Sequence, residues 1–349
     1  MLGKDTIIFV DGKKENRFAP IILEINKDVA FLAVYVPFSR VENKIKVKIK
    51  RPYEFLIKKV WYPIMKFLHK ICKKVPIPKE PYLYNAASKK KMLNMLFRYA
   101  PSAIAVSNPE ILRSMSEGIK RSGINVKIYA FSDDIGFDYN LVREEVAHYF
   151  ADNITVRDEL RTRDVPAAKI DVNPLPVEEE YYHPTDAGEG KQRIGFEPTQ
   201  RLCLIMPEGK YFETGTAPTD VAFVVRKCDA EIMKADEQGI KIAENVEEAE
   251  LMNACDFVAT RYNPYTIKRA SALKKNVVII ADENEKNQTI DYLVADERTA
   301  CAATGEELKT VIAMIDAGEI CLKGDEIDEK SAEKIAFEIK ELVRGAKQA

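Results

Sequence analysis

The residues best suited to chemistry in this chain are charged side chains that follow two short apolar runs. Asp133 and Asp134 come soon after the apolar run 124–131. At the end of a strand, such a carboxylate can take a proton as a general base or can cap a turn. Arg261 and Arg269 follow a second apolar run, where a guanidinium group can bind a phosphate or lie on the surface. For both groups the two interpretations stay open at this point.

The sequence has few of the residues that metal sites, disulfides and glycine-rich phosphate-binding loops require. The chain has six cysteines, no Cys-x-x-Cys pair and only three histidines. Its 15 glycines are about 4% of the residues, against roughly 7% in an average protein. The sequence contains neither a Gly-x-Gly-x-x-Gly string nor a Walker loop. We therefore expect no metal, no bound cofactor and no disulfide framework.

Length and composition are those of a protein with two globular domains. The 349 residues include 46% apolar and 31% charged side chains, with a net charge of −2, and about 150 residues make a typical domain. No apolar run reaches the ~18 residues that a membrane-spanning helix needs, and the N-terminus lacks the pattern of a signal peptide. A cytoplasmic location is therefore expected.

Short apolar runs alternate with helical patterns along the whole chain. In the first half, strands are predicted at 7–10, 30–36, 103–106, 124–131, 153–156 and 169–172. Helices are predicted there at 109–123, 141–150 and 157–163. This βα alternation is typical of a mainly parallel sheet with helices on both faces.

A polar stretch with proline and glycine separates this half from a second βα series. In the second half, strands are predicted at 202–206, 221–225, 240–243, 257–260 and 277–281. Helices are predicted there at 247–255, 265–275, 288–295, 306–317 and 325–344. The sequence therefore predicts an α/β protein of two domains with a ligand cleft between them, as open α/β folds use.

Residues 44–79 form the most basic part of the chain, with twelve Lys or Arg and one acid. At about 100° per residue, lysines and apolar residues of 54–75 gather on different helix faces. The residues expected to contact an anionic membrane are Lys59, Trp61, Lys66, Lys70, Lys73 and Lys74. An equal alternative is a surface helix with a solvated lysine face. Nucleic acid is not expected as a partner, because this segment has no recognised binding motif.

Two strings give the chain a family resemblance. The first is LRTRDVPAAKIDVNPLPV at 160–177, and the second is MNACDFVATRYNPYTIKRASALKKNVVII at 252–280. With the order of elements over about residues 53–315, they make the chain resemble the GT-B glycosyltransferases. The most similar group is the monogalactosyldiacylglycerol synthases and processive diacylglycerol glucosyltransferases, related to family 28. The resemblance implies a GT-B fold, in which the parallel sheets of two Rossmann-like domains face each other across a cleft.

The resemblance and the polar stretch together give the expected domain bounds. Residues 1–180 form an N-terminal, acceptor-side domain that includes the basic segment, and residues 181–200 form a linker. Residues 201–325 form a C-terminal domain on the nucleotide-sugar side. Residues 326–349 form a helix that returns to the N-terminal domain.

The resemblance also implies which residues bind the donor. Those at or near the family's donor-site positions are Arg261, Asn263, Thr266, Arg269, Asn287 and Gln288. Asn263 and Pro264 replace two glycines of the family, and Arg269 replaces a glutamate. The family's acceptor-activating histidine is missing, which leaves Asp133 and Asp134 as candidates for the base. Side-chain cations would then have to replace part of the backbone cradle for a diphosphate.

The function implied by the resemblance is transfer of a hexose from a UDP-sugar to a membrane lipid acceptor. The expected partners are the UDP-sugar, the lipid acceptor and an anionic membrane surface. The basic segment would allow peripheral attachment to the inner face of the cytoplasmic membrane. Because the family's glycines, glutamate and histidine are replaced, the alternative is a non-catalytic relative that binds a ligand or a partner protein. A nucleotide-sugar enzyme with a soluble substrate, such as an epimerase, is the third hypothesis.

Overall fold

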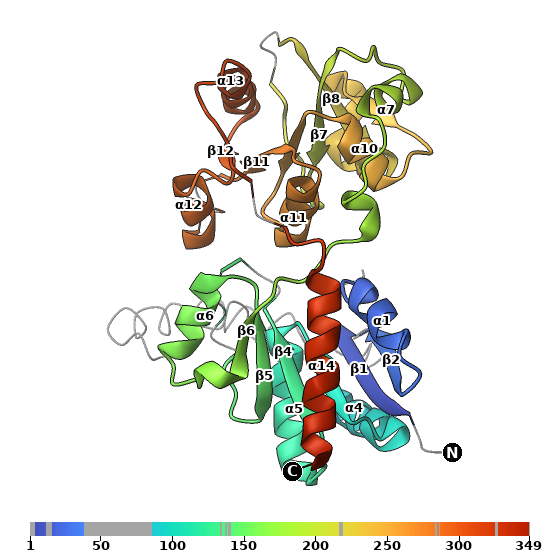
Figure 1. The fold of residues 1–349 in the computed structure, drawn as a ribbon. Coiled ribbons are helices and arrows are strands. Elements are labelled where there is room, and N and C mark those ends of the chain that lie inside the picture. The colour runs from blue at the N-terminus through green and yellow to red at the C-terminus, as the bar shows by residue number, and fades with distance from the viewer. Residues whose placement is uncertain are drawn as a thin grey trace. The chain divides into compact units, whose positions relative to one another are not determined.

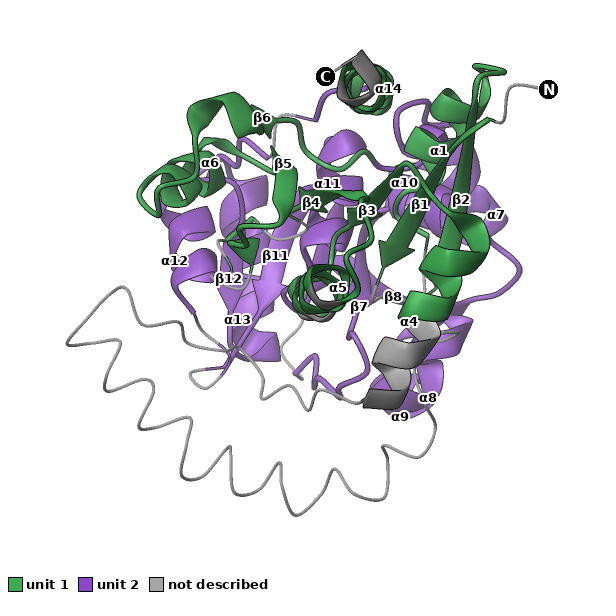
Figure 2. Cartoon of the chain, turned by 90° about the horizontal axis from the view of Figure 1, so that it is seen from below, with its two compact units in different colours: residues 1–176, 330–349 green, residues 177–329 purple. Residues whose placement is uncertain are grey.

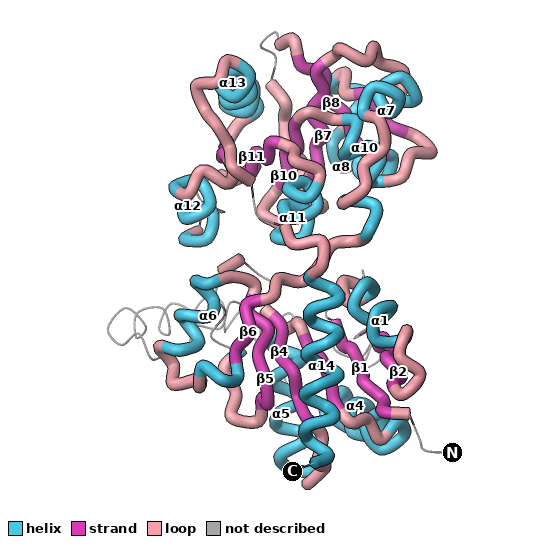
Figure 3. Tube along the Cα trace, viewed as in Figure 1, coloured by secondary structure: helices cyan, strands magenta, loops and turns pink. Residues whose placement is uncertain are grey.

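The structure is a computed structural model of the chain that divides into two compact units. The residues that it describes are 4–11, 16–37, 86–132, 135–136, 138, 141–215, 219–282, 285, 287–324 and 327–348. Unit 1 consists of Met1–Pro176 and Lys330–Ala349, and unit 2 consists of Val177–Glu329 (Figure 2). Each unit contains a six-stranded sheet, and strands and helices alternate along both (Figure 3).

Unit 1 has the strand order β2-β1-β3-β4-β5-β6, and the strand pairs are parallel. The strands are β1 (Asp5–Asp11), β2 (Phe31–Pro37), β3 (Ala103–Val106), β4 (Lys127–Phe131), β5 (Val146–Ala151) and β6 (Ile170–Val172). The α-helices are α1 (Ala19–Asn26), α4 (Ala86–Tyr99), α5 (Pro109–Ser122), α6 (Ile154–Arg161) and α14 (Ser331–Gln348).

Alternate residues of the central strands of unit 1 enter two different cores. Ile7 and Phe9 of β1 belong to a core that also includes residues of α1 and α14. Ile8 and Val10 belong to the core on the other face, which includes residues of α4, α5 and α6. Because successive side chains of a strand point to opposite faces, a strand covered on both faces is apolar throughout. This is why β1 was predictable as a short apolar run.

Unit 2 has the strand order β12-β11-β10-β7-β8-β9, again with parallel pairs. The strands are β7 (Arg201–Met206), β8 (Val221–Arg226), β9 (Lys241–Ala243), β10 (Phe257–Thr260), β11 (Asn276–Ile280) and β12 (Ala300–Ala302). The α-helices are α7 (Ala187–Arg193), α8 (Ala230–Met233), α9 (Ala235–Gln238), α10 (Glu248–Ala254), α11 (Pro264–Ala272), α12 (Gln288–Ala295) and α13 (Gly305–Asp316).

The structure differs from the sequence prediction most between residues 141 and 156. The helix predicted at 141–150 is wrong, because Val146–Ala151 form strand β5 between β4 and β6. The strand predicted at 153–156 is also wrong: α6 begins at Ile154, and the Asn153 side chain accepts a hydrogen bond from Val156 N at 3.0 Å. A capping asparagine thus outweighs the β-branched residues that follow it.

The segment 181–200, predicted as a linker, is part of unit 2. It contains α7, which Asp186 caps by accepting a hydrogen bond from Glu189 N at 2.8 Å. Lys191 is buried, and its Nζ donates to Asp256 Oδ2 at 2.9 Å and to the carbonyl of Gln200 at 2.8 Å. A buried ion pair explains how so polar a segment packs against the domain.

The last helix belongs to unit 1. Ile335, Ala336, Ile339 and Val343 of α14 are buried in the core that contains α1. Figure 1 shows α14, in red, along the blue-green elements of unit 1, and α14 and α1 are in contact. Among the described residues, no helix of either unit has the length and apolar character needed to cross a bilayer.

Candidate functional site

The centre of the unit 2 sheet is a topological switch point. Strands β7 and β10 are neighbours, and the sheet continues through β8 on one side and through β11 on the other. The loops that follow β7 and β10 therefore diverge at the carboxyl edge of the sheet. Open α/β folds bind their ligands at such a point. Arg261, Asn263 and Thr266 of the sequence prediction all lie in the loop and helix that follow β10.

A cavity of about 490 Å³ lies at this edge, within unit 2. Its wall consists of the loop after β7, the end of β10, the end of β11 and the turn that opens α13. The lining residues are Tyr211, Phe212, Glu213, Gly215, Arg261, Ile280, Asp282, Ala303, Thr304, Gly305 and Glu306. A volume of this size is in the range of small-ligand sites. We therefore take this cavity as the candidate ligand site.

Gly305 makes the wall of this cavity possible. A Cβ atom at Gly305 would lie 2.2 Å from the backbone carbon of Thr214 and 2.3 Å from the carbonyl oxygen of Glu213. Only glycine lets the start of α13 come so close to the loop after β7. The side chain of Thr304 caps the helix by accepting a hydrogen bond from Glu307 N at 3.2 Å. The close approach and the cap together hold this part of the wall.

Arg261 is the cation of the cavity wall. Its Nη2 donates to the carbonyl of Tyr211 at 3.0 Å, and its Nη1 forms an ion pair with Glu285. Lys210 also pairs with Glu285, so one carboxylate holds two cations. The Arg261 Nε is buried without a hydrogen-bond partner among the described residues. Besides its bond to Glu285 or Tyr211, each terminal nitrogen of the guanidinium carries a second N–H, which a ligand could use.

A carboxylate of the protein itself lies at the N-terminus of α11. Asn263 caps this helix, with its Oδ1 accepting from Tyr265 N at 3.1 Å. The Asn263 Nδ2 donates to Glu208 Oε1 at 2.9 Å, and Thr266 Oγ1 donates to the same oxygen at 3.1 Å. Pro264 occupies the first turn and has no N–H to offer. Two predicted donor-site residues thus converge on one carboxylate of the protein, which belongs to an exposed residue.

Arg269 is held by carboxylates rather than pointing to a free surface. Its Nε and Nη2 donate to Glu178 at 3.1 and 2.5 Å, and its Nη1 donates to Glu248 at 2.8 Å. The guanidinium also lies over the rings of Tyr265 and Tyr181, at 4.3 and 5.1 Å from their centroids. Burial alone would lower the pKa of Arg269, but its hydrogen bonds with Glu178 and the nearby carboxylates raise it. The residue stays charged and joins α11 to the start of unit 2.

Asn287 and Gln288 lie at the start of α12. The Asn287 side chain caps this helix by accepting from Thr289 N at 3.0 Å and from Ile290 N at 3.2 Å. Gln288 is the first residue of the helix and is exposed. Neither residue lines the 490 Å³ cavity.

The other predicted site residues lie outside the described residues. They include Asp133 and Asp134, the candidates for the base. The six residues predicted to contact a membrane also lie outside. They are Lys59, Trp61, Lys66, Lys70, Lys73 and Lys74.

Unit 1 has a buried charged cluster at the carboxyl ends of β1 and β3 that the sequence did not predict. Arg17 Nε and Nη2 donate to the two carboxylate oxygens of Asp11 at 2.8 and 2.6 Å, and Nη2 also lies 3.3 Å from Ser107 Oγ. Burial, with the Asp11 charge adding to it, raises the pKa of the nearby Tyr35. The available signal was an aspartate directly after a buried apolar strand, with an arginine six residues later.

His148 is not part of a helix, as the sequence suggested, but of strand β5. Its Nε2 lies 2.8 Å from Asp171 Oδ2 on the neighbouring strand β6, and the ring is buried. The imidazole thus links strands β5 and β6 within the sheet of unit 1.

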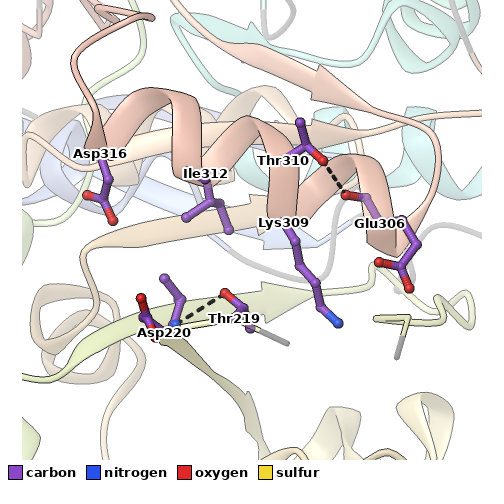
Figure 4. Close-up of a pocket in the computed structure, with 9 residues that line it drawn as sticks. Thr219, Asp220, Glu306, Lys309, Thr310, Ile312 and Asp316 are labelled. Atoms are coloured by element: carbon purple, nitrogen blue, oxygen red, sulfur yellow. Dashed lines mark hydrogen bonds between the residues drawn. The ribbon is translucent and has the colours of Figure 1, made fainter. Parts of the chain in front are cut away.

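A second cavity of unit 2, of about 530 Å³, lies between α13 and the start of β8. Figure 4 shows Lys309 extending from α13 toward Thr219, with Glu306 and Asp316 on the same helix. The Lys309 Nζ donates to the carbonyl of Gly215 at 3.0 Å, and Asp316 pairs with Arg201. Of the residues that the structure describes, three carboxylates and one cation line each of the two cavities, so charge does not distinguish them. The second cavity lies at the amino end of β8, whereas open α/β folds bind ligands at the carboxyl ends of the strands.

Solved structures of similar fold match nearly the whole chain. UDP-GlcNAc 2-epimerase from Neisseria meningitidis, bound to UDP-GlcNAc, has a TM-score of 0.61 at 14% identity, covering 96% of this chain and 100% of that one. HepE from Anabaena, in complex with UDP-glucose, has a TM-score of 0.53 at 14% identity, covering 99% and 100%. The glycosyltransferase SnogD from Streptomyces nogalater has a TM-score of 0.52 at 11% identity, covering 98% and 95%.

No family model matches the chain, and no curated protein matches its sequence significantly. The likeness to solved structures therefore establishes the fold, and the more specific resemblance to the diacylglycerol glycosyltransferase group stays a prediction. Two parallel sheets in two Rossmann-like units, together with these structural neighbours, show that the chain has the GT-B fold.

Proposed function

We propose that unit 2 binds the nucleotide of a UDP-sugar in the 490 Å³ cavity. The observation that carries the proposal is the place of this cavity, at the carboxyl edge of a Rossmann-like sheet and beside the cation Arg261. Structures of the same fold were solved with UDP-GlcNAc and with UDP-glucose, which supports this ligand class. The uridine would enter the cavity, and the diphosphate would lie toward Arg261 and the N-terminus of α11.

Within this proposal the predicted donor residues have different roles. Arg261, Asn263 and Thr266 would contact the diphosphate, because Arg261 lines the cavity and the other two lie at the N-terminus of α11, which begins three residues after Arg261. Arg269 would position α11 through Glu178 and Glu248 without touching the ligand. Asn287 and Gln288 stay candidates only for more distant parts of the donor.

Arg261→Ala is expected to weaken UDP binding at least tenfold, about 1.4 kcal/mol. The change removes the only side-chain cation on the cavity wall among the described residues. Calorimetric titration with UDP measures the effect. The matched control is Arg201→Ala, which removes an ion-paired arginine from the amino end of β7 in the same unit. Equal UDP affinity of the Arg261 variant and the wild type would show that the nucleotide binds elsewhere.

We propose further that the bound UDP-sugar donates its hexose to a membrane lipid acceptor. Asp133 or Asp134 would take the proton of the acceptor hydroxyl while the UDP diphosphate leaves. The support is the resemblance of the strings at 160–177 and 252–280 to glycolipid-forming transferases. The test is incubation with a labelled UDP-sugar and diacylglycerol vesicles, in which wild type forms labelled lipid and the Asp133→Asn, Asp134→Asn double variant forms none. Equal product from both would exclude these two residues as the base.

The basic segment 44–79 is expected to bind the protein to anionic vesicles, with binding that falls as salt rises. Each basic residue near such a surface contributes about 1 kcal/mol. Cosedimentation is expected to fall when three lysines of the segment become glutamine: Lys66, Lys70 and Lys73. The matched control replaces three lysines of unit 2: Lys227, Lys234 and Lys241. Equal binding to neutral and anionic vesicles would contradict the prediction.

A non-catalytic role is the second candidate function, and a specific observation favours it. Glu208 already lies against Asn263 and Thr266, and Asn263 and Pro264 replace the two glycines of the resembling family. Such a protein would bind a ligand or partner without turning it over. A soluble-substrate enzyme is the third candidate, because one structural neighbour is a UDP-GlcNAc 2-epimerase. Following UDP-GlcNAc by proton NMR distinguishes the two, since only an epimerase would change the sugar.

A further inference from the structure

The loop after β7 brings a carboxylate to the N-terminus of α11. Glu208 lies two residues after the end of β7, and both it and Gly209 have a left-handed backbone, with φ of 51° and 80°. The same loop continues through Lys210 into Tyr211, the first residue of the cavity wall. Glu208 therefore lies in the same short loop as Tyr211 of the cavity wall, three residues before it.

Glu208 uses the donors that an incoming phosphate would need. Its Oε1 accepts from Asn263 Nδ2 at 2.9 Å and from Thr266 Oγ1 at 3.1 Å. The two donors belong to the N-cap and the first turn of α11, where Pro264 lacks an N–H. A phosphate that accepted hydrogen bonds from Asn263 and Thr266 would lie against the Glu208 carboxylate. The two negative charges would repel each other, so the phosphate and the carboxylate cannot occupy this position together without a cost in binding free energy.

Three cations of this region are held by carboxylates of unit 2. Arg261 and Lys210 are both paired with Glu285. Arg269, one turn into α11, is taken by Glu178 and Glu248. Arg261 and Lys210 share one carboxylate while Arg269 has two, so these three cations and three carboxylates together carry no net positive charge.

We propose that Glu208 is an internal occupant of the anion position at the start of α11, which a phosphate-bearing ligand must displace. The proposal rests on the proposed function, because it concerns the same site. Glu208 thereby lowers affinity for nucleoside diphosphates selectively, while a ligand without phosphate is not affected.

The test compares three proteins in calorimetric titrations with UDP, uridine and inorganic pyrophosphate. Besides the wild type, they are Glu208→Gln and the control Glu297→Gln. Glu297 also has a left-handed backbone, with φ of 57°, and pairs with Lys323 at 2.8 Å. Each variant removes one carboxylate of unit 2 at a residue with a left-handed backbone. Glutamine keeps an acceptor oxygen for Asn263 and Thr266, so the fold is retained.

Glu208→Gln is expected to bind UDP and pyrophosphate at least tenfold more tightly than wild type, with uridine affinity unchanged and the control like wild type. A second variant, Glu208→Ser, should act in the same direction. UDP and pyrophosphate affinities that do not rise in either variant, or that rise equally in the control, would overturn the proposal. If pyrophosphate binding rises while no protein binds uridine or UDP, the proposal stands and the proposed nucleotide function fails. If UDP binds wild type and Glu208→Gln equally, the proposed function stands and this inference fails.

Discussion

Arg17→Ala is expected to lower the free energy of unfolding of unit 1 by about 4 kcal/mol, since breaking a buried ion pair by removing one partner is strongly destabilising. Asp11 is 0% exposed and Arg17 is 4% exposed, and two hydrogen bonds join them. Native-state hydrogen exchange measures the loss, because it resolves the amides of unit 1 from those of unit 2.

Two further variants separate the buried pair from other causes. Arg157→Ala removes an exposed arginine of α6 that pairs with its neighbour Asp158, and it should cost less than about 0.5 kcal/mol. The double variant Asp11→Leu, Arg17→Met removes both charges of this pair and should recover most of the lost stability. A loss of under about 1 kcal/mol in Arg17→Ala would contradict the view that this pair holds the carboxyl ends of β1 and β3.

Arg269→Ala is expected to destabilise unit 2 by about 3 kcal/mol, because it leaves Glu178 and Glu248 without their shared cation. The lost contacts also include the stacking of the guanidinium on Tyr265 and Tyr181. Hydrogen exchange of the unit 2 amides measures the change. Since Arg226 remains paired with Glu248, the greater part of the loss should come from Glu178.

The control for this variant is Arg298→Ala. Arg298 pairs with Asp296 at 2.6 Å and lies over Tyr292 at 5.5 Å, but both partners are close in sequence and its side chain is 26% exposed. It should cost less than about 1 kcal/mol. Arg269→Lys keeps the charge but loses the planar fork, so its stability should fall between wild type and alanine. If the Arg269→Lys variant is as stable as the wild type, the bidentate contact with Glu178 does not contribute to the stability of unit 2.

The alternation of elements could be predicted because each strand buried on both faces is an apolar run with clear ends. Strand β3, Ala103–Val106, was predicted at its observed bounds, and Asn108 accepts from Ile111 N at 3.0 Å at the start of the following helix. Between 141 and 156 the same reasoning failed, because an apolar run such as that of β5 does not reveal its period. Whether such a run forms a strand or a helix depends on the elements it packs against, which are set by the tertiary structure.

The details of the site were beyond sequence reasoning for a related reason. Glu208 is 55 residues from Asn263, and Glu178 is 91 residues from Arg269, so neither contact has a local signal. The family resemblance directed attention to the donor position of Arg269, whereas its guanidinium is held by carboxylates. Asp133, Asp134 and the basic segment lie outside the described residues, and their roles stay predictions.

A crystal structure of the protein with millimolar UDP tests the central claim most directly. We expect uridine density in the cavity between Tyr211 and Gly305, and diphosphate density near Arg261 and the start of α11. We also expect that the Glu208 carboxylate has left Asn263 and Thr266. Nucleotide bound away from this cavity, or no nucleotide at that concentration, would contradict the account.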